Sequence, residues 1–389
     1  MTAESVKIPA GMSSTRMWAR NTRAVIRELW LQGRYFEIIQ CVGLSLFILC
    51  NLVTLQLEDY FLHSVLSRVR TDNIVFILGH PRSATTSLHH AVLKCDGSCA
   101  STYYDILFPS VIMKFLMLPL RYIFDWTMRA KFDSPNHRIS LSEPPEEHFW
   151  LLLCMKSALI FSILFPSLSS NSELITELLT LDEHDWALFV KCLQRSIYWC
   201  RSNDHGVYVA RPLMLTMYLP KLRELFPKAK FLLCVRNPVD AIASFAELSA
   251  VATRSRLCSP RFKAHMKVYF QNVSSPGIRQ LASEVKGMFS RRSEKEEAAK
   301  VLDDSHREAA ASMEGQSMIV SFTAWASNQS LVMHRVCDFI GVASKQGDGC
   351  CYIDKKEAHT PNRKRYGVVS CQDVDRELKS ELEVLRAYF

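Results

Sequence analysis

A stretch in the first quarter of the chain constrains the fold more than any other. Residues 74–78 (IVFIL) are five consecutive apolar residues, a composition typical of a short strand buried on both faces of a sheet. Gly79 and Pro81 end this run, and Leu88 and Val92 restart apolar residues at helical spacing. The pattern therefore predicts a strand, a tight turn and a helix in direct succession.

The turn between these elements is rich in groups that bind anions. Its backbone N–H groups lie at a helix start, where the helix dipole also favours negative charge. An arginine adds a forked cation, and four hydroxyl side chains add donors. We therefore predict a cradle for a phosphate-like group; the alternative is an ordinary turn whose hydroxyls cap the helix. The cradle residues are His80, Pro81, Arg82, Ser83, Ala84, Thr85, Thr86 and Ser87.

A second polar turn follows another apolar run, Phe231–Val235. Pro238 suits the first turn of a helix, and Ser244 lies further along that helix. Arg236 stands at the carboxyl end of the predicted strand, where ligand-binding groups gather in parallel sheets. We therefore predict a second anion contact made by Arg236 and Ser244. The alternative is a strand-to-helix turn with a solvated arginine.

The alternation of strands and helices indicates the fold class. Val207–Ala210, Phe231–Val235 and Met318–Ser321 are predicted strands, and stretches of helical spacing separate them. We expect an α/β domain with a central parallel sheet over residues 74–389. Within it, the charged segment 251–315 is expected to be a surface insertion.

The N-terminal region predicts a membrane helix. Residues 38–57 (IIQCVGLSLFILCNLVTLQL) contain no charged side chain, and the preceding residues 1–37 form a basic segment. The length suits a membrane-spanning signal anchor with a cytoplasmic N-terminus, and residues 58–73 would then be a stem. The alternatives are a helix packed on the following domain and a helix lying in the membrane interface.

The net charge limits the classes of binding partner that the sequence predicts. A net charge of +8 fits an anionic ligand or a membrane surface, and it is too diffuse to indicate nucleic acid. The 13 cysteines are scattered and show no metal-ligand spacing. We therefore expect an anionic ligand or a membrane as the partner, with neither a nucleic acid nor a metal.

Taken together, the two turns resemble the motifs of the sulfotransferases that use 3′-phosphoadenosine 5′-phosphosulfate (PAPS). GHPRSATTSLHH (79–90) is similar to that family's P-R-S-G-T-T cradle for the 5′-phosphosulfate, and RNPVDAIASF (236–245) is similar to its R-x-P-x-D-x-x-x-S motif for the 3′-phosphate. SEPPEEHF (142–149) resembles a Pro-Glu-Glu-Asp segment of one branch. The resemblance implies a P-loop-like three-layer αβα fold. It also implies transfer of a sulfuryl group to a hydroxyl or amine of a carbohydrate, lipid or small molecule.

The same resemblance implies roles for single residues. Arg82 would stabilise the leaving phosphate, Arg236 and Ser244 would bind the 3′-phosphate, and Arg211 is a candidate for contacts near the sulfonate. The general base stays open, with Glu147 as the first choice. Glu146 and Glu147 have an alternative role as acids that complement the dipole of the helix they begin. The candidate bases are Glu146, Glu147, His148, His137 and Asp105.

The sequence also departs from the family pattern. Ala84 stands where the family has glycine, and its methyl group is tolerable at a negative φ and damaging at a positive φ. A Lys and a His found near residues 210–214 in one branch have no match here. The alternative function is therefore a nucleotide-binding or scaffolding membrane protein of the same fold without catalysis. A P-loop kinase is disfavoured, because no Gly-Lys-Ser/Thr follows the strand. For the enzyme, we expect a single-pass Golgi protein with a lumenal catalytic domain.

Overall fold

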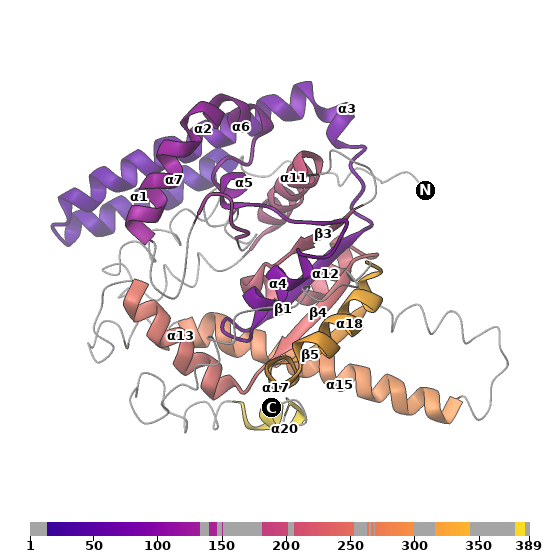
Figure 1. Cartoon of the computed structure of the whole chain (residues 1–389). Helices are drawn as coiled ribbons and strands as arrows, with labels where there is room; N and C mark the ends of the chain where they lie inside the picture. Colours follow the sequence, from indigo (N-terminus) through magenta and orange to yellow (C-terminus); the bar gives the residue numbers. More distant parts are fainter. Residues whose placement is uncertain are drawn as a thin grey trace.

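The computed structural model describes residues 14–132, 140–145, 150, 181–200, 206–252, 263, 266–267, 269–298, 316–342 and 378–385. Its centre is a five-stranded, all-parallel sheet with the strand order β2-β3-β1-β4-β5. The strands are β1 (Ile74–Gly79), β2 (Ser98–Cys99), β3 (Val207–Ala210), β4 (Lys230–Val235) and β5 (Ser317–Ser321). The predicted parallel α/β sheet is confirmed (Figure 1).

β1 lies in the middle of the sheet, and all six of its residues are buried. It pairs with β4 so that Phe76 lies opposite Phe231 and Gly79 lies opposite Cys234. The carboxyl ends of these two strands therefore meet at the same edge of the sheet. This register brings the two polar turns predicted from the sequence side by side.

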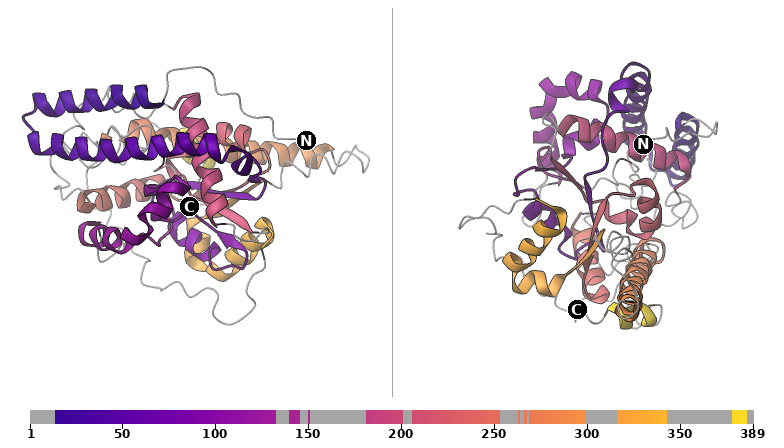
Figure 2. Two further views of the ribbon diagram at one scale, coloured as in Figure 1. Left: turned by 90° about the horizontal axis from the view of Figure 1, so that it is seen from above. Right: turned by 90° about the vertical axis from the view of Figure 1, so that its right-hand side faces the viewer.

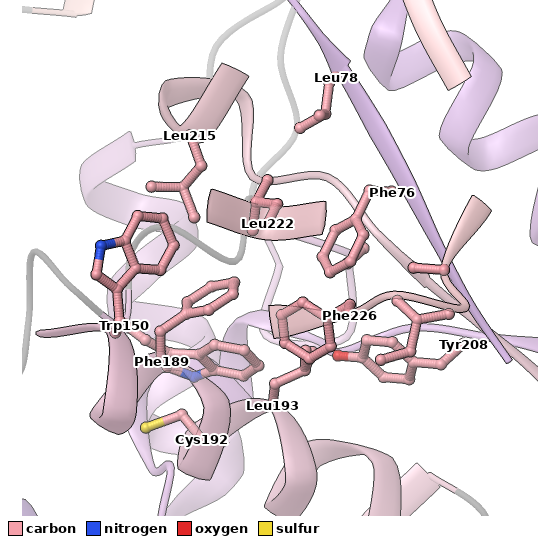
Figure 3. Close-up of a cluster of buried hydrophobic side chains, with 14 of the residues drawn as sticks. Phe76, Leu78, Trp150, Phe189, Cys192, Leu193, Tyr208, Leu215, Leu222 and Phe226 are labelled. Atoms are coloured by element: carbon pink, nitrogen blue, oxygen red, sulfur yellow. The ribbon is translucent and has the colours of Figure 1, made fainter. Parts of the chain in front are cut away.

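Alternate residues of β1 enter two different cores, as expected for a strand covered on both faces. Val75 and Ile77 pack with α4 (Thr85–Val92) and α18 (Gln329–Ile340) on one face. Phe76 and Leu78 pack on the other face in the cluster of Figure 3, together with Trp150 and residues of α11 (Glu183–Cys200), η3 (Leu213–Tyr218) and α12 (Leu219–Leu225). The protein is therefore a three-layer αβα structure.

The N-terminal helices form part of this structure. They are α1 (Ser14–Leu31), α2 (Tyr35–Phe61) and α3 (His63–Leu66). Ile48, Leu52 and Leu55 of α2 belong to the same buried cluster as Phe76 of β1. These side chains contribute to the core of the domain, which agrees with the alternative of a helix packed on the domain. The anchor at 38–57 and the stem at 58–73 stay predictions. By length and composition alone, α2 is the one helix of the described residues that could cross a membrane, and 33% of its most apolar window is buried.

The segment 251–315 also contributes to the core where the structure describes it. Its described helices are the end of α13 (Pro238–Ala252), η4 (Phe270–Ser274) and α15 (Ser275–Ala298). Phe270, Ile278 and Val285 are buried in one cluster with Val235 of β4 and Ile242 of α13. Phe270, Ile278 and Val285 are therefore core residues, so the surface insertion does not extend to them. For the rest of 251–315 the insertion stays a prediction.

The remaining helices complete two sides of the molecule. α5 (Tyr103–Leu107), α6 (Val111–Met117), η1 (Leu118–Leu120) and α7 (Arg121–Phe132) lie with α1 and α2 on one side. α15, α17 (Phe322–Ser327) and α20 (Lys379–Leu385) lie on the opposite side (Figures 1 and 2).

Candidate active site

The predicted strand, turn and helix are present, with β1 ending at Gly79 and α4 beginning at Thr85. Gly79 has a φ of +152°, and a Cβ atom at this position would lie 2.6 Å from the carbonyl oxygen of Cys234. Only glycine fits a backbone that approaches its neighbouring strand this closely. The turn is therefore held directly against the end of β4.

The backbone of the turn is left-handed at two residues that are not glycine. Arg82 has a φ of +71°, and Ala84, the N-cap of α4, has a φ of +64°. The turn is closed by a hydrogen bond from Ser83 N–H to the His80 carbonyl (3.2 Å). Ala84 thus adopts the conformation in which its methyl group is unfavourable, by about 1 kcal/mol relative to glycine.

The two predicted turns contact each other directly. The Arg236 guanidinium donates a hydrogen bond to the carbonyl of Arg82 (2.7 Å), and Arg82 Nε donates to Ser244 Oγ (3.0 Å). The Arg236 guanidinium also stacks on Phe322, 4.1 Å from the ring centroid. Burial lowers the pKa of Arg236, and nearby Arg82 lowers it further, against the raising effect of Asp240. The two cations therefore gather at one place, where an anion would relieve their repulsion.

Arg211 lies at the same edge of the sheet, directly after β3. It is buried, and its guanidinium donates hydrogen bonds to Thr86 Oγ1 of α4 and to the Pro145 carbonyl. The structure thus brings Arg211 to the first turn of α4, beside the cradle. The contact of Arg211 near the sulfonate stays a prediction.

Two hydroxyl groups of the cradle differ in their partners. Ser87 Oγ accepts a hydrogen bond from the indole N–H of Trp325 in α17 (3.2 Å). Ser83 Oγ is buried and has no hydrogen-bond partner among the residues that the structure describes. A buried hydroxyl without a partner is unfavourable by about 1–3 kcal/mol, so Ser83 is a group that a bound anion would satisfy.

His80 is the buried end of the turn. Its Nδ1 lies 2.7 Å from the Pro81 carbonyl, and its Nε2 lies 2.9 Å from Ser274 Oγ of η4. Because a carbonyl only accepts, Nδ1 carries the proton, and Nε2 accepts from the serine hydroxyl. Burial lowers the pKa of His80 to about 4, and the charge of Arg236 acts in the same direction against the hydrogen bond to Pro81. His80 is therefore a neutral side chain that fixes the turn.

A comparison with known protein families identifies the family to which the chain belongs. The sequence model of the sulfotransferase family matches residues 74–346. This range is more than half of the chain and includes both turns. The chain belongs to the sulfotransferase family. The match begins at the first residue of β1.

Curated relatives agree with this assignment. The chain is 25% identical over 231 residues to the omega-hydroxy-beta-dihydromenaquinone-9 sulfotransferases Stf3 of Mycobacterium bovis and Mycobacterium tuberculosis. The match covers 57% of this chain and 55% of each relative, so the chain spans about half the length of the curated relatives it matches.

Two crystal structures share its fold. Sulfotransferase STF9 of Mycobacterium avium has a TM-score of 0.62 at 13% identity, over 90% of this chain and 85% of that one. STF1 of Mycobacterium tuberculosis has a TM-score of 0.57 at 15% identity, over 86% of this chain and 85% of that one. At these sequence identities, the structural similarity shows a shared fold only.

The candidate general bases of the chain divide into two groups. Glu146, Glu147, His148 and His137 lie outside the described residues. Asp105 is buried, where it pairs with Lys114 (2.8 Å) and caps α5 through Thr102. These contacts give Asp105 a structural role, because both interactions require its carboxylate to stay in place.

Sequence reasoning missed three residues that hold the cradle from outside it. Trp325 binds Ser87, Ser274 binds His80, and Thr216 of η3 accepts a hydrogen bond from Gly79 N–H (3.0 Å). Each comes from an element distant in sequence, and none belongs to a local motif. A lone Trp, Ser or Thr in an apolar helix carries no signal that would have revealed these contacts.

Proposed function

We propose that this sulfotransferase transfers a sulfuryl group from PAPS to a hydroxyl or amine of its acceptor. The observation that carries the proposal is the direct contact between the two turns, through Arg236, Arg82 and Ser244. One PAPS molecule can place its phosphosulfate at one turn and its 3′-phosphate at the other only if the two turns are adjacent. The contact between the turns supports this arrangement.

The residues present fit such a donor. When bound, PAPS supplies the sulfuryl group and a phosphate leaving group. The start of α4 offers backbone N–H groups and a positive dipole end, and Ser83 offers a buried hydroxyl without a partner in the described part of the chain. Arg82 would hold the charge that develops on the leaving phosphate, and Arg236 with Ser244 would hold the 3′-phosphate.

Arg211 would act through its fixed position. It is buried and bound to Thr86 and to the Pro145 carbonyl, so its guanidinium keeps one orientation beside the first turn of α4. A preorganised cation stabilises developing charge without reorganisation during the reaction. We place its contact at the sulfuryl oxygens.

Glu147 is our choice for the base that takes the proton of the acceptor. It lies two residues beyond Pro145 in the sequence, and the Pro145 carbonyl accepts a hydrogen bond from Arg211 (3.4 Å). Trp150, three residues further, donates to the Asp105 carbonyl (3.3 Å) in the core. Both flanks of the acidic segment are therefore attached to the domain. Glu146 and His148 are the neighbouring candidates.

The acceptor that we propose is a lipid-like compound with a hydroxyl group. The curated relatives act, by their names, on an omega-hydroxylated dihydromenaquinone, which is a lipid. Carbohydrates and small hydroxyl compounds remain the other acceptor classes. The Golgi location and the lumenal catalytic domain stay predictions, and the mycobacterial relatives give them no support because bacteria lack this compartment.

Calorimetry with 3′-phosphoadenosine 5′-phosphate (PAP) tests the donor. The full chain should bind with a micromolar dissociation constant, about −8 kcal/mol. Arg82→Ala and Arg236→Ala should each abolish measurable binding, and Arg335→Ala, at an exposed position on α18, should not. Equal binding of ATP and PAP would contradict a PAPS site, and so would undiminished binding by both variants.

Turnover separates the enzyme from the alternative, a nucleotide-binding protein of the same fold without catalysis. The left-handed Ala84 is the observation that favours the alternative. With ³⁵S-labelled PAPS and a panel of hydroxylated lipids, sugars and phenols, we expect label transfer by the wild-type chain. Glu147→Gln should abolish transfer and keep PAP binding. PAP binding without transfer to any acceptor would support the non-catalytic alternative.

A further inference from the structure

Helix α2 carries an apolar stripe on its outward side. Ile39, Val42, Leu46, Val53 and Leu57 recur at helical spacing and are all exposed, Ile39 to 69%. The opposite side of the same helix is buried in the core. A helix that is apolar on all sides belongs either inside a protein or in a lipid environment, and the outward side of α2 is exposed at the residues named above.

A second group of exposed apolar side chains continues this surface. Phe115 and Leu116 of α6 are exposed, as are Tyr122, Ile123 and Trp126 of α7, Trp126 to 73%. α6 packs against α2, and α7 follows on the same side of the molecule (Figures 1 and 2). Tyrosine and tryptophan are the side chains enriched where a membrane meets water.

Helix α1 adds positive charge to the same side. It packs along α2 through Val25 and Leu29, and its exposed residues include Arg23 and Arg27. Trp30 at its end is also exposed. Together, the exposed side chains of α1, α2, α6, η1 and α7 form what we call the apolar-basic surface.

The contacts of α2 disfavour a helix that spans a bilayer. Asn51 donates to the Leu107 carbonyl (3.0 Å), and buried Glu58 pairs with Arg195 of α11 (2.7 Å). Lipid cannot surround α2 while these groups hold it against the domain. A spanning α2 would also carry Arg23 and Arg27 of α1 into the hydrocarbon, which is strongly unfavourable.

We propose that the apolar-basic surface seats this protein on the face of an anionic phospholipid membrane, with α1, α2 and α7 in the plane of the interface. The apolar stripe of α2 and the aromatic side chains of α7 would enter the boundary between headgroups and acyl chains. The arginines of α1 match the negative charge of anionic headgroups. Amphipathic helices with aromatic residues and a basic flank bind membranes in this manner.

Vesicle flotation with the purified full chain, after removal of detergent, tests the proposal. The chain should float with vesicles of phosphatidylcholine mixed with phosphatidylglycerol. It should bind at least tenfold less to phosphatidylcholine alone, and high salt should weaken the binding. Ile39→Glu combined with Trp126→Glu should reduce binding at least tenfold. The matched control is Leu331→Glu on α18, a comparably exposed leucine on another side (49%), which should bind as wild type.

Three results would overturn the proposal. Retention in cell membranes after alkaline carbonate extraction would establish a spanning helix. A stable oligomer in solution that Ile39→Glu dissociates would show that a second copy covers the surface. A monomer that binds no vesicles would show that the surface needs no lipid. PAP binding by each variant reports separately on the donor site, so failure here leaves the proposed function intact.

Discussion

The Arg236 guanidinium donates a hydrogen bond of 2.7 Å to the Arg82 carbonyl, across 154 residues of sequence. This bond ties the end of β4 to the turn after β1, and Arg82 returns a second bond to Ser244 of α13. The two anion-binding turns are therefore one structural unit. The relative position of the two turns depends on the guanidinium of Arg236. Its Nη1 donates to the Arg82 carbonyl, and its other N–H groups can bind a ligand.

Arg236→Lys should consequently weaken PAP binding although the charge is kept. An ammonium group cannot both bond the Arg82 carbonyl and contact a phosphate with the bidentate geometry of a guanidinium. We expect a loss of affinity of about tenfold to a hundredfold by calorimetry, corresponding to about 1.4–2.7 kcal/mol. Arg335→Lys on α18 is the control. Unchanged affinity in Arg236→Lys would mean that only charge matters at this position.

Ala84→Gly should stabilise the protein. Ala84 has a φ of +64°, which glycine adopts without the steric penalty of a Cβ atom. Urea denaturation should show a free energy of unfolding higher by about 1 kcal/mol. Ala243→Gly, inside α13, is the control and should lower it by about the same amount, since glycine disfavours helix interiors. Destabilisation by both changes would show that the turn gains nothing from glycine.

Gly79→Ala should be severely destabilising, because its Cβ would lie 2.6 Å from the carbonyl oxygen of Cys234. The backbone of a central strand cannot yield without separating β1 from β4. We expect a loss of more than about 3 kcal/mol, or no soluble protein. Gly43→Ala is the matched control: no atom lies within 4 Å of the added methyl group, and α2 should gain up to about 1 kcal/mol.

The sequence predicted those strands and turns whose own residues show a recognisable pattern. The run 74–78 is apolar without interruption because β1 is covered on both faces, and Arg236 follows β4 as predicted. The two-residue β2 was missed, since a strand that short has no period. The sequence after β5 forms two helices, because Asn328 ends α17 and caps α18 through its side chain.

The part that could not be predicted depends on tertiary contacts. Residues 38–57 have the composition of a membrane span, and only the positions of Ile48 and Glu58 in the core show that α2 belongs to the domain. The sequence likewise left the sign of φ at Ala84 open, although the family has glycine at this position. The bonds from Trp325 and Ser274 to the cradle join elements far apart in the chain, which no local pattern encodes.

The stability of this protein should fall on mild acidification, and His80 should be one cause. Its ordinary pKa is 6.5, and burial lowers the folded-state pKa to about 4. Below pH 6.5 the His80 side chain binds a proton in the unfolded chain and stays neutral in the folded chain. The free energy of unfolding therefore decreases as the pH falls from about 6.5 to about 4. Between pH 7 and pH 5, this one group should remove about 2 kcal/mol.

The measurement is urea denaturation of wild type and His80→Asn at pH 7 and pH 5. Burial also lowers the pKa of His89 well below 6.5, so His89 destabilises the protein on acidification too, and the wild type alone cannot isolate His80. The decrease between the two pH values should be smaller in His80→Asn by about 2 kcal/mol, whatever the variant loses at both. His334→Asn, at an exposed position, controls for removal of a histidine. An equal decrease in wild type and His80→Asn would show that His80 does not stay neutral in the folded protein, and the assignment of its Nε2 as an acceptor from Ser274 would fail with it.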